Sequence, residues 1–215
     1  MGLPPDTTNG AIALELRGMT KQFGSLVACD EVDLVLRRGE IHGILGENGS
    51  GKSTLMKMLI GLALPDHGAI QIDGEPCRIT DPLDAATRGI GMVHQHYSLV
   101  DALTVWENVA LGEKGKLDAE ATRERIRSIS ERYGLHVDPD ALVRDLTAGV
   151  RQRVEIIKCL RHEPRILLLD EPTSVLTPAE SEHLFEVLRV GVIREGWAVA
   201  LVSHNVVCRV LILVL

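Results

Sequence analysis

The stretch "GENGSGKST" at residues 46–54 decides the class of fold. It fits G-x-x-x-x-G-K-[ST], a pattern in which glycines let backbone N–H groups turn inward around phosphate oxygens. The apolar run "EIHGIL" (40–45) precedes it, and the helix-like run "KSTLMKMLIGL" (52–62) follows it. This strand-to-helix context predicts a phosphate-binding loop, and the alternative is a glycine-rich turn with a chance lysine.

The individual positions of the loop have distinct expected roles. Lys52 would reach the β and γ phosphates of a nucleotide, and the Ser53 hydroxyl would contact Mg²⁺. The helix that begins here would add the partial positive charge of its N-terminus. The candidate nucleotide-binding residues of this stretch are Gly46, Glu47, Asn48, Gly49, Ser50, Gly51, Lys52, Ser53 and Thr54.

Composition limits the remaining possibilities. A chain of 215 residues with 45% apolar content can bury one substantial core, so we expect one domain with subdomains. The formal charge of −7 argues against a nucleic-acid partner, since phosphate backbones are bound by clustered Lys and Arg. The four cysteines form no C-x-x-C pair, which predicts neither a zinc site nor a disulfide framework and fits a reducing cytoplasmic setting. No signal peptide, lipidation signal or membrane-spanning run is expected.

Short apolar runs alternate with longer helical patterns along the chain. Three runs alternate apolar and polar residues, which predicts half-buried strands at 12–16, 32–36 and 69–73. Three others are almost continuously apolar, which predicts buried parallel strands at 41–45, 165–170 and 198–203. Helices are expected at 118–134, 145–160 and 180–195.

A second chemical element is "RILLLDEPTS" (165–174). Its apolar strand ends in Asp170, which places a carboxylate at the carboxyl end of a parallel sheet, where it can hold Mg²⁺. Glu171 diverges from Asp170 and is free to orient or deprotonate a water that attacks the γ-phosphate. The alternative for this acidic pair is the polar start of an ordinary loop.

A third element is "DLTAGVRQRVEIIKCL" (145–160), whose first helical turn carries Thr147 and Gly149. A hydroxyl, open N–H groups and a positive helix end are suited to an anion. The order of the phosphate loop, Gln95 in "MVHQHYSLV", this helix, the acidic pair and His204 in "ALVSH" resembles the ATP-binding cassette (ABC) family. The resemblance runs from about Gly18 to His204.

The resemblance implies an α/β fold with a P-loop NTPase core, a mostly parallel sheet, an antiparallel β-subdomain and a helical subdomain. We expect a nucleotide-binding domain over 12–204, with the helical subdomain at about 97–160, between tails at 1–11 and 205–215. It also implies that Phe23 in "KQFG" stacks on adenine and that His204 contacts the γ-phosphate. Gln95 would contact Mg²⁺ and the attacking water, so that Ser53, Gln95 and Asp170 are the expected metal ligands.

The helix start "LTAGV" (146–150) stands where the family signature usually reads LSGGQ. In the family this segment closes over the γ-phosphate bound by the other protomer, a role carried over to Thr147 and Gly149, whereas Ala148 and Val150 depart from the pattern. The loop around Gln95 is where family members sense their transmembrane partner. His94 and His96 are interpreted as surface or partner-contact residues because they would face away from Gln95.

Finer features resemble the ATPase subunits of bacterial importers for nucleosides and simple sugars, notably "DEPTSVLTPAE" (170–180) with Thr177 before proline. Such subunits generally carry two cassettes in one chain. The resemblance implies ATP and Mg²⁺ as cofactors and a place on the cytoplasmic face of the membrane. The implied partners are a second cassette, transmembrane permease subunits and, indirectly, an extracellular solute-binding protein. Alternatives are a non-hydrolysing or remnant cassette, and a soluble cassette ATPase acting on DNA or ribosomes.

The segment "VVCRVLILVL" (206–215) departs from the family, because the polar helix that normally follows the histidine is missing. Its β-prone residues would be an aggregation hazard unless they join a sheet. We expect 210–214 to lie beside 198–203 as an antiparallel return or a continuation, since 205–209 is too short for a parallel crossover. From this we expect marginal stability or self-association, a displaced His204 and weak hydrolysis.

Overall fold

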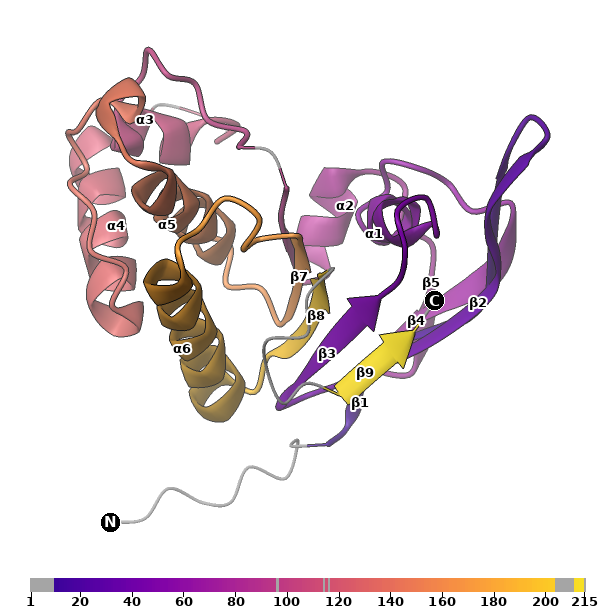
Figure 1. Ribbon diagram of the computed structural model, residues 1–215. Helices are drawn as coiled ribbons and strands as arrows, with labels where there is room; N and C mark the ends of the chain where they lie inside the picture. Colours follow the sequence, from indigo (N-terminus) through magenta and orange to yellow (C-terminus); the bar gives the residue numbers. More distant parts are fainter. Residues whose placement is uncertain (1–9, 96, 114, 116, 204–210, 215) are drawn as a thin grey trace.

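The structure is a computed structural model that describes residues 10–95, 97–113, 115, 117–203 and 211–214. Its strands form two sheets (Figure 1). The antiparallel sheet has the order β2-β1-β4-β5 and is made of β1 (Ile12–Phe23), β2 (Leu26–Arg37), β4 (His67–Ile72) and β5 (Glu75–Cys77). The second sheet has the order β6-β7-β8-β3-β9 and is made of β3 (Glu40–Leu45), β6 (Ile90–Val93), β7 (Ile166–Asp170), β8 (Ala198–Val202) and β9 (Leu211–Val214). All pairings in the second sheet are parallel.

Six α-helices and one short 3-10 helix complete the described part of the chain. They are α1 (Lys52–Leu59), α2 (Pro82–Thr87), α3 (Val105–Ala110), α4 (Ala119–Tyr133), η1 (Val143–Asp145), α5 (Ala148–Leu160) and α6 (Pro178–Glu195). Figure 1 shows α3, α4 and α5 gathered at one side of the molecule, with the antiparallel sheet at the other. The predicted helical subdomain therefore contains α3, α4 and α5.

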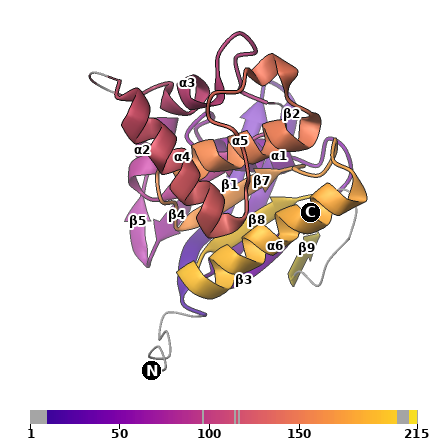
Figure 2. The same ribbon diagram turned by 90° about the vertical axis from the view of Figure 1, so that its left-hand side faces the viewer.

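The parallel sheet is the middle layer between two hydrophobic cores. Side chains alternate across it, so Leu168 and Ala200 pack with α1 and the antiparallel sheet. Leu167 and Leu169 instead face α5 and α6 in the second core. Figure 2 shows α4, α5 and α6 lying in front of this sheet. The predicted α/β fold, and the six strands expected from the sequence, are confirmed.

Helix ends follow local chemistry. Thr177 caps α6 by accepting from the Glu180 backbone N–H at 3.3 Å, while Glu180 accepts from the Thr177 backbone N–H at 2.9 Å. Pro178 occupies the first turn, where no backbone donor is needed, and Gly196 ends the helix at φ 67. This capping box accounts structurally for the Thr-Pro pair that the sequence singled out.

The register of the parallel sheet brings the carboxyl ends of its strands to one edge. Asp170 on β7 lies opposite Val202 on β8, and Val202 lies opposite Ile44 on β3. Val93, at the end of β6, lies opposite Leu169. The loops that leave β3, β6 and β7 therefore start at the same edge of the sheet, which is where an open α/β sheet binds ligands.

The expected position of the last strand is wrong. Strand β9 does not lie beside β8 but on the far side of β3, with Gly43 opposite Ile212, and it runs parallel. Eight residues join Val202 to Leu211, and an extended chain of that length reaches roughly 26 Å. That exceeds the about 20 Å needed to return along a short strand and step sideways by two strands. Marginal stability, self-association and weak hydrolysis stay predictions.

Candidate nucleotide-binding site

The phosphate loop joins β3 to α1 and depends on its glycines. Gly51 precedes α1 at φ 90 and has no side chain with which to cap the helix, so first-turn N–H groups face the loop. A Cβ at Gly51 would lie 3.2 Å from the carbonyl carbon of Ala28 and overlap its oxygen. Gly49, at φ 86, also adopts a conformation that L-residues rarely take. The loop is thus shaped to present backbone donors to an anion.

Lys52 holds a positive charge in the middle of this loop. Its side chain is buried, with 4% of the residue exposed. The Nζ atom donates to the carbonyl oxygens of Gly46 and Glu47 at 2.7 Å each, and to Ser50 Oγ at 3.3 Å. The ammonium group therefore sits where phosphate oxygens and loop carbonyls would compete for its three donors.

Asp170 ends β7 beside the loop and is buried. Burial raises the pKa of its carboxyl above the usual 3.8, the Ser53 hydroxyl opposes this by hydrogen bonding, and the charge of Glu171 adds to the rise. Its Oδ1 atom has no hydrogen-bond partner among the described residues. An orphaned carboxylate oxygen next to a hydroxyl is a hard-oxygen donor set that fits Mg²⁺.

Two predicted catalytic residues that lie 76 positions apart in the sequence are hydrogen-bonded to each other. Gln95, which follows β6, donates from Nε2 to Glu171 Oε2 at 3.0 Å. Glu171 has a positive φ of 47, and its backbone N–H donates to the Val202 carbonyl at 3.0 Å. A non-glycine residue in this conformation carries strain, and such strain gathers at functional sites. The turn directs Glu171 off the line of β7 and toward Gln95.

Phe23 lies at the tip of the β1–β2 hairpin and is 52% exposed. It shares a cavity of about 260 Å³ with the phosphate loop and Glu171. The Lys21 ammonium lies 5.3 Å from the centre of its ring. An exposed aromatic face at the mouth of a phosphate-binding cavity can stack on a planar base. The structure therefore gathers Phe23, the loop and Glu171 in one place.

The candidate signature residues lie elsewhere. Thr147 caps α5 by accepting from the Val150 backbone N–H at 3.4 Å. Gly149 is buried in α5, and a Cβ there would overlap the Glu180 carboxylate. Neither residue lines the cavity that holds the phosphate loop. His204 and His96 lie outside the described residues.

A groove of about 510 Å³ beside this site was missed by reasoning from the sequence. It lies between α2, β6 and the second half of α5, with apolar walls that include Leu83, which is 61% exposed, and Met92. His94 also lines it, and the coulombic effect of His94 opposes the rise that burial causes in the pKa of Asp170. An exposed leucine in a short helix is the only signal in the sequence, and such a leucine is common on protein surfaces.

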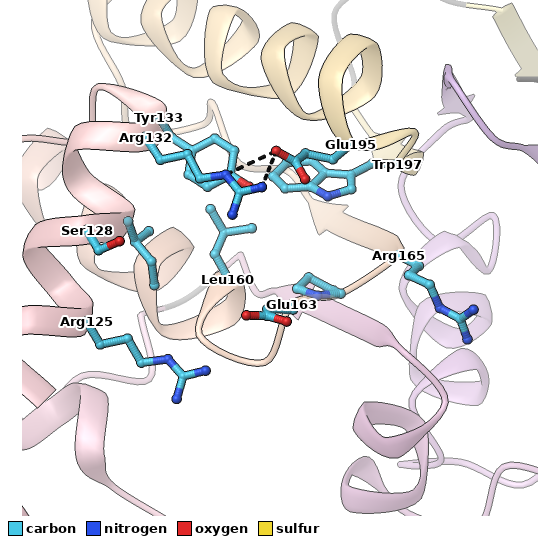
Figure 3. A pocket seen from close by; sticks show the side chains of 11 residues that line it. Arg125, Ser128, Arg132, Tyr133, Leu160, Glu163, Arg165, Glu195 and Trp197 are labelled. Carbon is cyan, nitrogen blue, oxygen red and sulfur yellow. Dashed lines mark hydrogen bonds and ion pairs between the residues drawn. The ribbon is translucent and has the colours of Figure 1, made fainter. Parts of the chain in front are cut away.

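A further cavity of about 280 Å³ lies among α4, α5, α6 and the start of β7 (Figure 3). Arg132 donates from Nε to Glu195 at 3.1 Å across its upper side, and the rings of Tyr133 and Trp197 lie 5.3 Å apart behind that pair. The carboxyl ends of three helices meet there, and their partial negative charge opposes a phosphate. The phosphate loop, at a helix N-terminus, is therefore the better nucleotide site.

Comparison with known proteins agrees with this geometry. A family model described as ABC transporter matches residues 29–174, and the chain belongs to this family. Among curated proteins, it is 50% identical to the nucleoside import ATP-binding protein NupA of Lactococcus lactis subsp. cremoris over 196 residues. It is 44% identical to the guanosine import ATP-binding protein NupO of Bacillus subtilis over 187 residues. These matches cover 89% and 85% of the chain but 38% and 36% of the relatives, so the chain spans well under half their length.

Solved structures agree as well. A dimeric structure of the bacterial ABC transporter cassette MJ0796 has a TM-score of 0.78 and 29% identity, and the match covers 89% of this chain and 88% of that one. A nucleotide-free ABC transporter cassette has a TM-score of 0.82 at 24% identity, covering 90% and 82% of the two chains. The resemblance to ABC ATPases inferred from the motifs is confirmed. Among the described residues, no helix is long and apolar enough to cross a membrane.

Proposed function

We propose that this chain is the ATP-binding and ATP-hydrolysing cassette of a transporter that imports nucleosides or simple sugars. The observation that carries the proposal is the hydrogen bond between Gln95 and Glu171 at 3.0 Å, beside the buried Asp170 Oδ1 atom, which has no hydrogen-bond partner among the described residues. These groups lie at the same sheet edge as the phosphate loop, as phosphoryl-transfer sites require. The names of the relatives NupA and NupO support the substrate class.

The side chains have separate tasks in this proposal. Phe23 stacks on adenine, while Lys52 exchanges its loop carbonyls for β- and γ-phosphate oxygens. Glu171 accepts a proton from the attacking water, and Gln95 orients both the water and the Glu171 carboxylate. Ser53, Asp170 and Gln95 would hold Mg²⁺, which neutralises phosphate charge when bound. Fixed donors aimed at the developing charge then lower the barrier to hydrolysis.

A second cassette completes the site. Thr147 and Gly149 do not line the phosphate cavity of their own chain, which fits a role at the γ-phosphate of a facing cassette. The related cassette MJ0796 was solved in a dimeric form. The segment after Gln95 and the groove beside it would contact transmembrane permease subunits, with an extracellular solute-binding protein acting through them. We infer that the chain works on the cytoplasmic face of the membrane.

The test compares nucleotide binding with turnover in the purified chain. Glu171→Gln should keep the affinity for Mg-ATP and abolish hydrolysis, because the amide preserves the bond from Gln95 but cannot accept a proton. Glu182→Gln, an exposed carboxylate on α6, is the control and should hydrolyse ATP like the parent. Parent-like turnover by Glu171→Gln would refute the catalytic assignment, and a parent chain that does not bind Mg-ATP would refute the function.

A further inference from the structure

Lys21, two residues before Phe23 on β1, is a cation that the proposed hydrolysis does not use. Side chains alternate along a strand, so Lys21 and Phe23 lie on the same face of β1. The Lys21 Nζ atom lies over the Phe23 ring, 5.3 Å from its centre, which is within the range of a cation–π contact. An aromatic ring has two faces, and the ammonium group takes one of them. A planar base can stack on the other face.

Asp66 fixes the position of this ammonium group. Its Oδ1 atom accepts from Lys21 Nζ at 2.9 Å, and its Oδ2 atom accepts from the Gln22 backbone N–H at 2.8 Å. The Asp66 backbone N–H donates to the Thr20 carbonyl oxygen at 2.9 Å. Hydrogen bonds from the Gln22 backbone and from Lys21 lower the pKa of the Asp66 carboxyl below its usual 3.8, so the group is charged at neutral pH. Asp66 therefore holds both the backbone and the charged end of this part of β1.

The tip of the β1–β2 hairpin is where such an anchor has most effect. Strand β4 pairs with β1 only as far as Thr20. In the described part of the chain, the hairpin beyond Thr20 pairs with no third strand (Figure 1), and a two-stranded ribbon is marginally stable in water. Asp66 stands immediately before β4, and its carboxylate bonds the Gln22 N–H past the end of that strand. The carboxylate thus secures the tip that carries Phe23.

Phe23 itself is not held by burial. It is 52% exposed and lines the cavity that it shares with the phosphate loop. Ordering an exposed side chain on binding costs affinity, so a ring that is already fixed binds a base more tightly. A cation over one face of the ring also draws electron density away from the other face. This reduces the repulsion between the negative π-faces of the ring and of a stacked base.

We propose that Lys21 and Asp66 are positioning residues for the nucleobase: Asp66 holds the Lys21 ammonium group against one face of Phe23, and the base stacks on the other. The inference rests on the proposed ATP-binding function. Lys21 acts on the base through Phe23, whereas Lys52 acts on the phosphates directly. Removing the charge of Lys21 should therefore not affect a ligand that has phosphates but no base.

The test compares the binding of Mg-ATP with that of Mg-tripolyphosphate, which carries three phosphates and no base, by calorimetry. The parent is the full chain with Glu171→Gln, which prevents turnover. Lys21→Met removes the charge and keeps an apolar side chain of similar length. It should weaken Mg-ATP binding about three- to fivefold, the range of an exposed cation–π contact. The affinity for Mg-tripolyphosphate should change by less than about 1.5-fold.

A double-mutant cycle tests whether Lys21 acts through the ring. Phe23→Ala removes the ring, so adding Lys21→Met should then cause no further loss of Mg-ATP affinity. Lys21→Arg keeps a cation that pairs with a carboxylate and stacks on an aromatic face, and it should keep the parent affinity within about twofold. Arg17→Met is the matched control. Arg17 is a cation of the same strand that pairs with Glu15 at 2.8 Å, and both affinities should equal those of the parent.

Two replacements of Asp66 test the anchor. Asp66→Ala should weaken Mg-ATP binding at least as much as Lys21→Met, because it releases both the ammonium group and the Gln22 backbone. Asp66→Asn keeps an acceptor for the Gln22 N–H but loses the charge that holds Lys21, so its affinity should lie between those of Asp66→Ala and the parent. If Asp66→Ala fails to fold, Lys21→Met decides, since it leaves the bond from Gln22 to Asp66 in place.

The outcomes are distinct. Parent-like binding of Mg-ATP by Lys21→Met would overturn the proposal, and so would an equal loss of affinity for both ligands, which would mean direct attraction between Lys21 and the phosphates. A full effect of Lys21→Met in the Phe23→Ala background would also overturn it. A parent that binds Mg-ATP no more tightly than Mg-tripolyphosphate would overturn this inference and leave the proposed function standing. A parent that binds neither ligand would refute both.

Discussion

Replacing Gly51 by alanine should disable nucleotide binding by displacing the phosphate loop. At φ 90 an L-residue is strained, by about 1–2 kcal/mol for a left-handed conformation. The added Cβ would also overlap the Ala28 carbonyl oxygen of β2 and lie 3.1 Å from Cys29 Sγ. Backbone cannot yield as a flexible side chain does, so the loop must move by roughly 1 Å, a displacement that can cost about a hundredfold in a positioned site.

The assay measures the Mg-ATP dissociation constant together with the free energy of unfolding in urea. We expect Gly51→Ala to weaken Mg-ATP binding by about a hundredfold, or about 2.7 kcal/mol. The matched control is Gly74→Ala, in the turn between β4 and β5, where φ is 83 and no heavy atom lies within 4 Å of the added Cβ. This control carries the backbone strain without the collision. Equal affinities in the two variants would refute the reasoning, because the collision at Gly51 would then leave the phosphate loop in its binding position.

Two further predictions concern charged groups. Lys52→Ala should raise the Mg-ATP dissociation constant more than tenfold, on the scale of a charge-assisted hydrogen bond worth about 1.5–3 kcal/mol. The control Lys57→Ala, at the exposed end of α1, should leave the dissociation constant unchanged. An unchanged constant for Lys52→Ala would contradict the nucleotide site. Burial lowers the pKa of His42 below its usual 6.5 in the folded chain. As pH falls below 6.5, His42 is therefore protonated in the unfolded chain before it is protonated in the folded one. The free energy of unfolding should fall as pH drops from 6.5 toward the folded-state pKa. Urea unfolding should show a smaller loss over this range in His42→Met, and an identical loss in both proteins would exclude His42 as its source.

Local chemistry was readable from the sequence because it depends on near neighbours. The spacing of Gly46, Gly51 and Lys52 predicts a phosphate loop, since the glycines and the lysine act within one turn of backbone. Continuous apolar runs predicted the buried parallel strands, and the acidic pair after one of them predicted the sheet edge that carries Asp170. The resemblance to the ABC family rested on these same short patterns.

Tertiary structure decided what depends on strand order and register. The bond between Gln95 and Glu171, and the hydrogen bonds that Glu155 accepts from Ser98, join residues 76 and 57 positions apart, and no periodicity encodes such distances. The sequence predicted a helix at 145–160 with an anion-binding first turn, but it did not single out Glu155, because a buried glutamate looks like any other glutamate until its partner is placed. The last strand was misplaced for the same reason. Its apolar residues required a sheet, but the free edge beside β3 exists only once β8 has paired with the other side of that strand.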